Sequence, residues 1–193
     1  MGRTREFDPD VVLERAMDLF WARGFEATSM TDLVEHLGIG RASLYATFGS
    51  KHDLYLAALR RYLLRSEAGF VTALAQPGPA LPAVRAFVRS WIDEALTDPD
   101  RRGCLVVNAA VELAPREPEV ARQVAVSWTV VETALLSSLL RAQAQGELAP
   151  DKDAHEIANF LLVVMQGVRV VARAAPDADR LRAAARLALA ALD

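Results

Sequence analysis

The chain contains a single cysteine, Cys104, among its 193 residues, so it cannot form an intramolecular disulfide bond. Cysteine this sparse fits a reducing compartment. Long uncharged runs are also missing: the longest in the apolar C-terminal half, Ile157 to Val168, is shorter than the roughly 20 residues of a membrane-spanning helix. No apolar run precedes Asp8, so the N-terminus is not a secretory signal. We therefore expect a cytoplasmic protein without a membrane span.

An excess of positive charge is missing too. Nine Lys and Arg balance nine Asp and Glu up to Ser66, and the formal net charge of the whole chain is −3. Affinity for nucleic acid depends on local phosphate contacts and not on total charge. A local cluster of Arg3, Arg5, Arg41 and Lys51 would be sufficient, so the charge balance alone decides nothing about DNA binding.

The patterns of common catalytic and metal sites are absent as well. The three histidines, His36, His52 and His155, lack metal-ligand spacing, and there is no HExxH, CxxC or Gly-x-Ser-x-Gly motif. Gly38-Ile39-Gly40 superficially resembles a phosphate loop, but no strand pattern precedes it and the third glycine is missing. We expect no enzymatic activity, no cofactor and no metal.

Helical periodicity dominates what is present. Hydrophobic residues make up 52% of the chain, ample for a globular core, and no strand pattern of period two competes. Caps and breakers predict an all-α fold of about nine helices. These cover roughly residues 9–23, 31–37, 41–48, 51–75, 81–96, 103–114 and 117–144, then a helix capped by Asp151 that runs to about 174, and a last one introduced by Pro176-Asp177 that ends near 192. The breaker Pro77-Gly78-Pro79 is a candidate hinge.

Residues 28 to 51 have the form of a helix-turn-helix. Ser29 and Asp32 form a capping-box pattern that starts a helix near Thr31, and Gly38 can adopt the left-handed conformation that ends it. In the next short helix Leu44 and Phe48 lie four residues apart and serve as buried anchors. Its polar side chains then point outward: Arg41, Ser43, Tyr45 and Thr47. A helix of this kind can enter the major groove of DNA.

In residues 8 to 55 the chain resembles the TetR/AcrR family of transcriptional repressors. The resemblance lies in the joint spacing of Gly24-Phe25, Thr28-Ser29-Met30, Leu37-Gly38-Ile39, Leu44-Tyr45, Phe48, Ser50-Lys51 and Leu54. It implies a homodimer whose residues 1–52 form a three-helix DNA-binding head. Residues 53–193 would form a helical body for effector binding and dimerisation. A small molecule in the body would release palindromic operator DNA.

The resemblance also assigns DNA contacts. Arg41 opens the reading helix and can bind guanine with two hydrogen bonds. The family places base or methyl contacts at Ser43 and Ala46, and the phosphate contacts would come from Ser29, Thr31, Tyr45, Thr47 and Lys51. Gly40 departs from the hydroxyl residue usual at its position, which weakens the cap of that helix. Outside the family pattern, Tyr45 is equally an aromatic residue with a buried ring and a wet hydroxyl, and Arg41 and Lys51 are ordinary surface charges.

The body has candidate ligand contacts. Cys104, Asn108 and Glu112 are spaced by four and form one polar stripe on a helix. Apolar walls and one further polar group are expected from Phe87, Trp91, Trp128, Met165 and Gln166. The alternative for each apolar residue is ordinary core packing. A buried Glu112 needs a partner, either a cationic or hydrogen-bonding effector or simply Arg116, and Cys104 is either an oxidant sensor or merely buried.

Dimer contacts are expected from the last two helices. Residues 154–172 are apolar almost all round, so this helix should be buried on two sides, one of them facing a second copy. The predicted interface consists of Ala158, Leu162, Met165, Val168, Leu181, Ala185 and Leu189. The two heads would then reach successive major grooves, about 34 Å apart. The rival interpretation is a helical small-molecule carrier or scaffold, which gives no reason for Tyr45 and Lys51.

Overall fold

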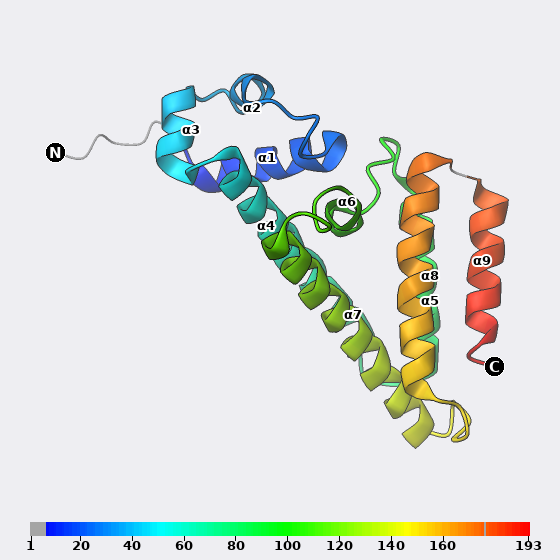
Figure 1. Ribbon diagram of the computed structural model, residues 1–193. Coiled ribbons are helices and arrows are strands. Elements are labelled where there is room, and N and C mark those ends of the chain that lie inside the picture. The colour runs from blue at the N-terminus through cyan, green and yellow to red at the C-terminus, as the bar shows by residue number, and fades with distance from the viewer. Residues whose placement is uncertain (1–6, 176) are drawn as a thin grey trace.

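A computed structural model describes residues 7–175 and 177–193, and within these ranges the chain forms nine α-helices and no strand. The predicted all-α class is therefore confirmed. The helices are α1 (Pro9–Arg23), α2 (Met30–Leu37), α3 (Arg41–Phe48), α4 (Lys51–Leu74), α5 (Ala80–Thr97), α6 (Leu105–Glu112), α7 (Pro118–Ala144), α8 (Ala154–Ala174) and α9 (Ala178–Ala190). Arg3, Arg5 and Pro176 lie outside the described residues. In Figure 1, α1 to α3 gather at one end of the molecule and α9 lies at the other.

Helices α6 and α8 differ most from their predicted boundaries. Helix α6 is shorter than expected at both ends, because residues 101–104 are irregular, with Gly103 at φ 68°, and residues 113–116 form turns. Helix α8 is capped by Asp153 and not by Asp151: the Asp153 side chain accepts the backbone N–H groups of His155 and Glu156 at 2.8 and 3.1 Å. Both aspartates suit a cap, and the turn at Pro150-Asp151 leaves only the second at the helix start.

The hydrophobic side chains form two cores. The N-terminal core combines α1 to α3 and the first half of α4 with α6 and the start of α7, as far as Val124. The C-terminal core combines the end of α4 with α5, the rest of α7, α8 and α9. Trp128 packs against both. The head is thus packed on the body through α6 and α7, and the division after residue 52 stays a prediction.

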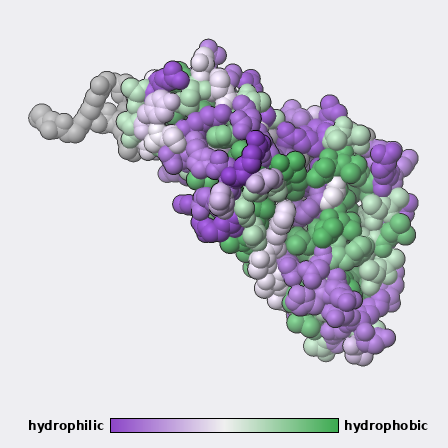
Figure 2. All heavy atoms as spheres, viewed as in Figure 1, coloured by the Kyte–Doolittle hydropathy of each residue, from purple (hydrophilic) through white to green (hydrophobic). Residues whose placement is uncertain are grey.

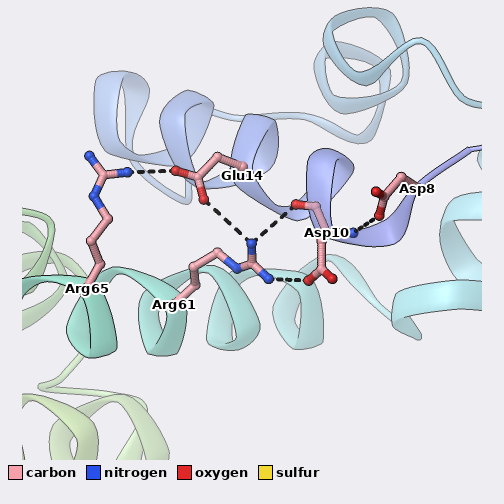
Figure 3. A network of polar contacts seen from close by, with 5 residues as sticks. All are labelled: Asp8, Asp10, Glu14, Arg61 and Arg65. Atoms are coloured by element: carbon pink, nitrogen blue, oxygen red, sulfur yellow. Dashed lines mark hydrogen bonds and ion pairs between the residues drawn. The ribbon is translucent and has the colours of Figure 1, made fainter.

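Ion pairs fix α1 against α4 (Figure 3). The Arg61 guanidinium pairs with Asp10 and, at 3.6 Å, with Glu14, while Arg65 Nη1 lies 2.7 Å from the other Glu14 oxygen. Asp8 caps the same end of α1 by accepting the N–H of Asp10 at 2.8 Å. These exposed pairs set the register between the two helices, although each one adds little to stability.

Helices α7 and α8 are long and apolar enough to cross a membrane by length and composition, with 27 and 21 residues. The sequence had predicted no membrane-spanning helix, because its uncharged run at Ile157–Val168 is short. Core helices have the same composition, and here α7 packs on α4, α5, α6 and α8, while α8 packs on α5, α7 and α9.

The residues predicted for the dimer interface lie in the core of the single chain. All seven are buried inside the single chain, and none is more than 9% exposed: Ala158, Leu162, Met165, Val168, Leu181, Ala185 and Leu189. They form the inner faces of α8 and α9, which pack on α5 and on each other. The outer faces carry a different exposed set, Phe160, Val163, Val170 and Leu187. Hydrophobic residues gather over α8 on the face shown in Figure 2.

Candidate nucleic-acid interface

The start of α2 is fixed by the predicted capping box. Ser29 Oγ accepts the N–H of Asp32 at 3.1 Å, and Asp32 Oδ2 accepts the N–H of Ser29 at 2.8 Å. Hydrogen bonds from the side chain and backbone of Ser29, with a smaller effect of Arg23, lower the pKa of Asp32. Gly38 ends the helix at φ 70° in the left-handed conformation. The sequence pattern therefore located both ends of α2 to within one residue.

Helix α3 presents a polar face to solvent. Leu44 is fully buried and Phe48 is half-buried, so these two anchor the helix as predicted. Ser43 and Ala46 are exposed, as is Arg41, which has no hydrogen bond or ion pair with the described part of the chain. The Tyr45 side chain is 43% exposed and Thr47 is half-buried. Gly40 gives α3 no side-chain cap, in agreement with the prediction.

The start of α4 completes this surface. Ser50 and Asp53 form a second capping box, with the Ser50 N–H 2.9 Å from Asp53 Oδ2 and the Asp53 N–H 3.0 Å from Ser50 Oγ. This box was not among the predicted caps, although its Ser-x-x-Asp pattern repeats that of Ser29 and Asp32. Lys51, in the first turn, holds its Nζ 4.1 Å above the Phe25 ring. A cation beside the N-terminal N–H groups of a helix suits a phosphate group.

Ser29 and Thr31, the remaining predicted contacts, are both exposed at the start of α2. The segment before them is held tightly: the Thr28 hydroxyl donates to the Gly24 carbonyl at 2.6 Å, and Thr28 is fully buried. The predicted DNA-contact residues thus lie on the starts of α2 and α4 and on the outer face of α3.

Four of the predicted ligand residues line one cavity in the body: Trp91, Cys104, Trp128 and Gln166. Its free volume is about 10 Å³, room for at most a single water molecule. Trp128 Nε1 is buried and has no hydrogen-bond partner in the described residues. Tyr62, which sequence analysis did not select for the pocket, also lines the cavity, and its hydroxyl donates to Cys104 Sγ at 3.7 Å.

Burial and the neighbouring Cys104 raise the pKa of Tyr62, so its hydroxyl keeps its proton. Phe87 and Met165 lie behind the cavity wall. Phe87 packs against Trp91, with ring centroids 6.0 Å apart, and the Met165 carbonyl accepts the Trp91 Nε1–H at 3.1 Å. Arg169, almost fully buried, stacks its guanidinium 4.5 Å from the centre of the Trp91 ring.

Asn108 and Glu112 do not reach this cavity. Both line an open hollow of about 530 Å³ between α1, α6 and α8. Asn108 donates its side-chain amide to the Arg102 carbonyl at 3.0 Å. The Glu112 carboxylate accepts the N–H groups of Phe25 and Glu26 at 3.1 and 2.8 Å, and the Arg116 guanidinium donates to the Glu112 backbone carbonyl at 3.3 Å. The predicted polar stripe is therefore divided between two sites: Cys104 lines the small cavity, whereas Asn108 and Glu112 line the open hollow.

Comparisons with known proteins agree with this geometry. A family model for "Bacterial regulatory proteins, tetR family" matches residues 12–58, and one for "Tetracyclin repressor-like, C-terminal domain" matches residues 80–188. The chain is 39% identical over 195 residues to the uncharacterized HTH-type transcriptional regulator YezE of Bacillus subtilis, covering 100% of both. It is 34% identical over 181 residues to the HTH-type transcriptional repressor ComR of Escherichia coli, covering 93% of this chain and 86% of that one.

Among solved structures, a cysteine mutant of the TetR family transcriptional regulator CifR, complexed with 26-bp double-strand operator DNA, is 35% identical to this chain. The alignment covers 100% of both chains with a TM-score of 0.87.

Proposed function

The chain belongs to the TetR family of transcriptional regulators, and from this premise we propose that it represses transcription by binding a palindromic operator as a homodimer. We further propose that a small molecule in the body releases it from DNA. ComR is a repressor and CifR was solved on operator DNA, and both resemble this chain over nearly its full length.

The observation that carries this proposal is the solvent-facing polar surface of α3 beside the start of α4. Arg41 extends from the first turn of α3 without an intramolecular partner among the described residues, and its guanidinium fork suits guanine. Tyr45 and Lys51 supply a hydroxyl and a cation for the flanking phosphates, and Ser29 and Thr31 supply hydroxyls from α2. A scaffold protein would have no use for this combination on one surface.

Dimerisation is assigned to the outer face of α8. Phe160, Val163, Gly167 and Val170 recur at spacings of three and four, so they form one exposed stripe, and Leu187 is exposed on the neighbouring α9. Val163 and Leu187 are 69% and 75% exposed in the single chain. Apolar side chains this exposed along one stripe are typical of a protein interface. A two-fold axis through the stripe would pair it with itself and place two heads on one operator.

The effector site is assigned to the cavity around Trp91, Cys104, Trp128 and Gln166. The aromatic walls suit an apolar or aromatic compound, and the Trp128 Nε1–H, which has no partner within residues 7–175 and 177–193, suits a hydrogen-bond acceptor on it. Because the free volume is only about 10 Å³, binding must move the walls apart. Such a displacement in the body is the means by which a ligand would act on the heads.

The decisive experiment measures binding to the DNA immediately upstream of the gene by fluorescence anisotropy, against a scrambled duplex and at two salt concentrations. We expect saturable, sequence-dependent and salt-sensitive binding with two protomers or more per site. If neither that DNA nor any sequence from a genome-wide selection is preferred, the rival function of a helical small-molecule binding protein replaces this one. We assign no enzymatic activity, and we place the protein in the cytoplasm with DNA, away from any membrane.

A further inference from the structure

Glu112 connects the body to the DNA-binding head. It is the last residue of α6, and its two carboxylate oxygens accept one backbone N–H each, from Glu26 at 2.8 Å and Phe25 at 3.1 Å. The fit is close, because a Cβ on Gly24 would lie 2.9 Å from Glu112 Oε2. Gly24 has φ 90°, a conformation that also favours glycine. The carboxylate therefore occupies a place shaped for it by the turn that joins α1 to α2.

This turn positions much of the candidate DNA surface. It runs directly into buried Thr28 and into Ser29, which caps α2. The Phe25 ring packs edge-on against Tyr55 of α4 at 5.1 Å between centroids, and its face carries the Lys51 ammonium. Burial raises the pKa of Tyr55, and the nearby Glu112 carboxylate raises it further. Holding Phe25 thus places both the start of α2 and the start of α4.

The other end of α6 is fixed to the body and to α1. Cys104, just before the helix, and Val106, in its first turn, line the effector cavity. The Gly103 carbonyl accepts the Trp21 Nε1–H at 3.0 Å, and the Arg102 guanidinium stacks 4.1 Å from the Trp21 ring centre. An eight-residue helix is about 12 Å long and stiff, so α6 links the cavity to the turn as one unit.

We propose that Glu112 is a positioning residue for operator binding: through its hydrogen bonds to Phe25 and Glu26, the body holds the head in the orientation that fits DNA. The inference rests on the proposed function and adds to it the group through which the body acts on the head. Glu112 does not touch DNA. Its removal lowers the fraction of heads in the competent orientation, and the apparent affinity falls by the same factor.

The test compares Glu112→Gln with Glu147→Gln. Glutamine keeps the size of the side chain but replaces one acceptor oxygen with an amide donor, so at least one backbone N–H loses its partner. Glu147 makes the same type of bond at the far end of the body, where its Oε2 accepts the Leu81 N–H at 2.7 Å. The control therefore makes the same substitution, with the same loss of charge, at a carboxylate that does not touch the head.

Two readouts separate positioning from general stability. Hydrogen exchange should become faster at the Phe25 and Glu26 amides in Glu112→Gln and stay unchanged there in Glu147→Gln, and this measurement needs no operator. Operator affinity by fluorescence anisotropy should fall by roughly tenfold in Glu112→Gln, with the concentration of active sites unchanged, and by less than twofold in Glu147→Gln. Glu112→Asp, which keeps the charge, should recover part of the loss.

The possible failures are distinguishable. If the unmodified protein binds no operator, the proposed function fails, whatever the exchange data show. If it binds and Glu112→Gln binds equally well, or if exchange at Phe25 and Glu26 does not change, the positioning role is overturned while the proposed function stands. An equal loss of affinity in Glu112→Gln and Glu147→Gln overturns it too, because stability alone would then explain the effect.

Discussion

Replacing Val163 with glutamate should convert the proposed dimer into monomers without unfolding the chain. Val163 lies in the middle of the outer stripe of α8 and is 69% exposed in the single chain, so a polar side chain is tolerated there in the monomer. In a two-fold interface the substitution occurs twice, once in each protomer. Both glutamates would face an apolar surface.

The magnitude follows from the exposed area. Complete burial of a valine side chain contributes about 1.5 kcal/mol, so covering the exposed two thirds of Val163 contributes about 1 kcal/mol per protomer and about 2 kcal/mol per dimer. Placing two carboxylates in an apolar contact adds a further cost of at least about 1 kcal/mol. The sum of about 3 kcal/mol corresponds to a more than 100-fold increase in the dimer dissociation constant.

Sedimentation equilibrium over a range of protein concentrations measures this directly. Leu64→Glu is the matched control, because Leu64 is 67% exposed but lies on α4, away from α8 and α9. We expect the control to remain a dimer and Val163→Glu to sediment as a monomer with unchanged helical content by circular dichroism. Equal dissociation constants for the two variants would refute the assignment of the interface to this stripe.

Arg41→Ala should lose about 1 to 3 kcal/mol of discrimination at one base pair, whereas Tyr45→Ala should weaken binding to all duplexes. Fluorescence anisotropy with a series of operators that each carry one substituted base pair separates the two effects. A uniform loss of affinity for Arg41→Ala would contradict a role in base reading. Ser29→Ala removes the side-chain cap of α2 and should lower the free energy of unfolding by about 1 kcal/mol in urea titrations, so an unchanged midpoint would count against the capping box. Because the pKa of Asp32 is lowered in the folded state, its stabilising effect is present above the ordinary value of 3.8 and disappears as the pH falls through the folded-state pKa. Asp32→Asn should therefore reduce the loss of thermal stability on acidification below about pH 4, and an acid response equal to that of the unmodified chain would show that this carboxylate does not contribute.

Local chemistry explains which parts of the fold were predictable from the sequence. The capping box of Ser29 and Asp32 and the left-handed Gly38 depend on residues only a few positions apart, so the pattern alone locates α2 and the turn to α3. The outward face of α3 could be predicted equally well, because Leu44, which is fully buried, and Phe48, which is half-buried, anchor the opposite side of the helix. These signals were sufficient for the candidate DNA surface.

Longer-range packing decided what the sequence could not. Helix α8 is apolar almost all round, so periodicity cannot tell the side that packs on α5, α7 and α9 from the side left outside, and the residues predicted for the interface lie on the inner side. The spacing of Cys104 and Glu112 predicted one helical face, but Cys104 lies just before α6 and Glu112 is its last residue. Eight residues of helix span about 12 Å, however, so one end of that face meets the cavity and the other meets the head.

The N-terminal core has a consequence for how such proteins can be recombined. Its side chains come from two separate parts of the chain, residues 7–63 and residues 104–124, and α5 lies between them in sequence. A chimera that exchanges only the first 52 residues between two relatives joins one half of a core to a foreign second half. Helix α3 contributes Leu44 and Phe48 to this core, and its outer face lies outside it. New DNA specificity is therefore easier to obtain by changing that outer face than by exchanging whole heads.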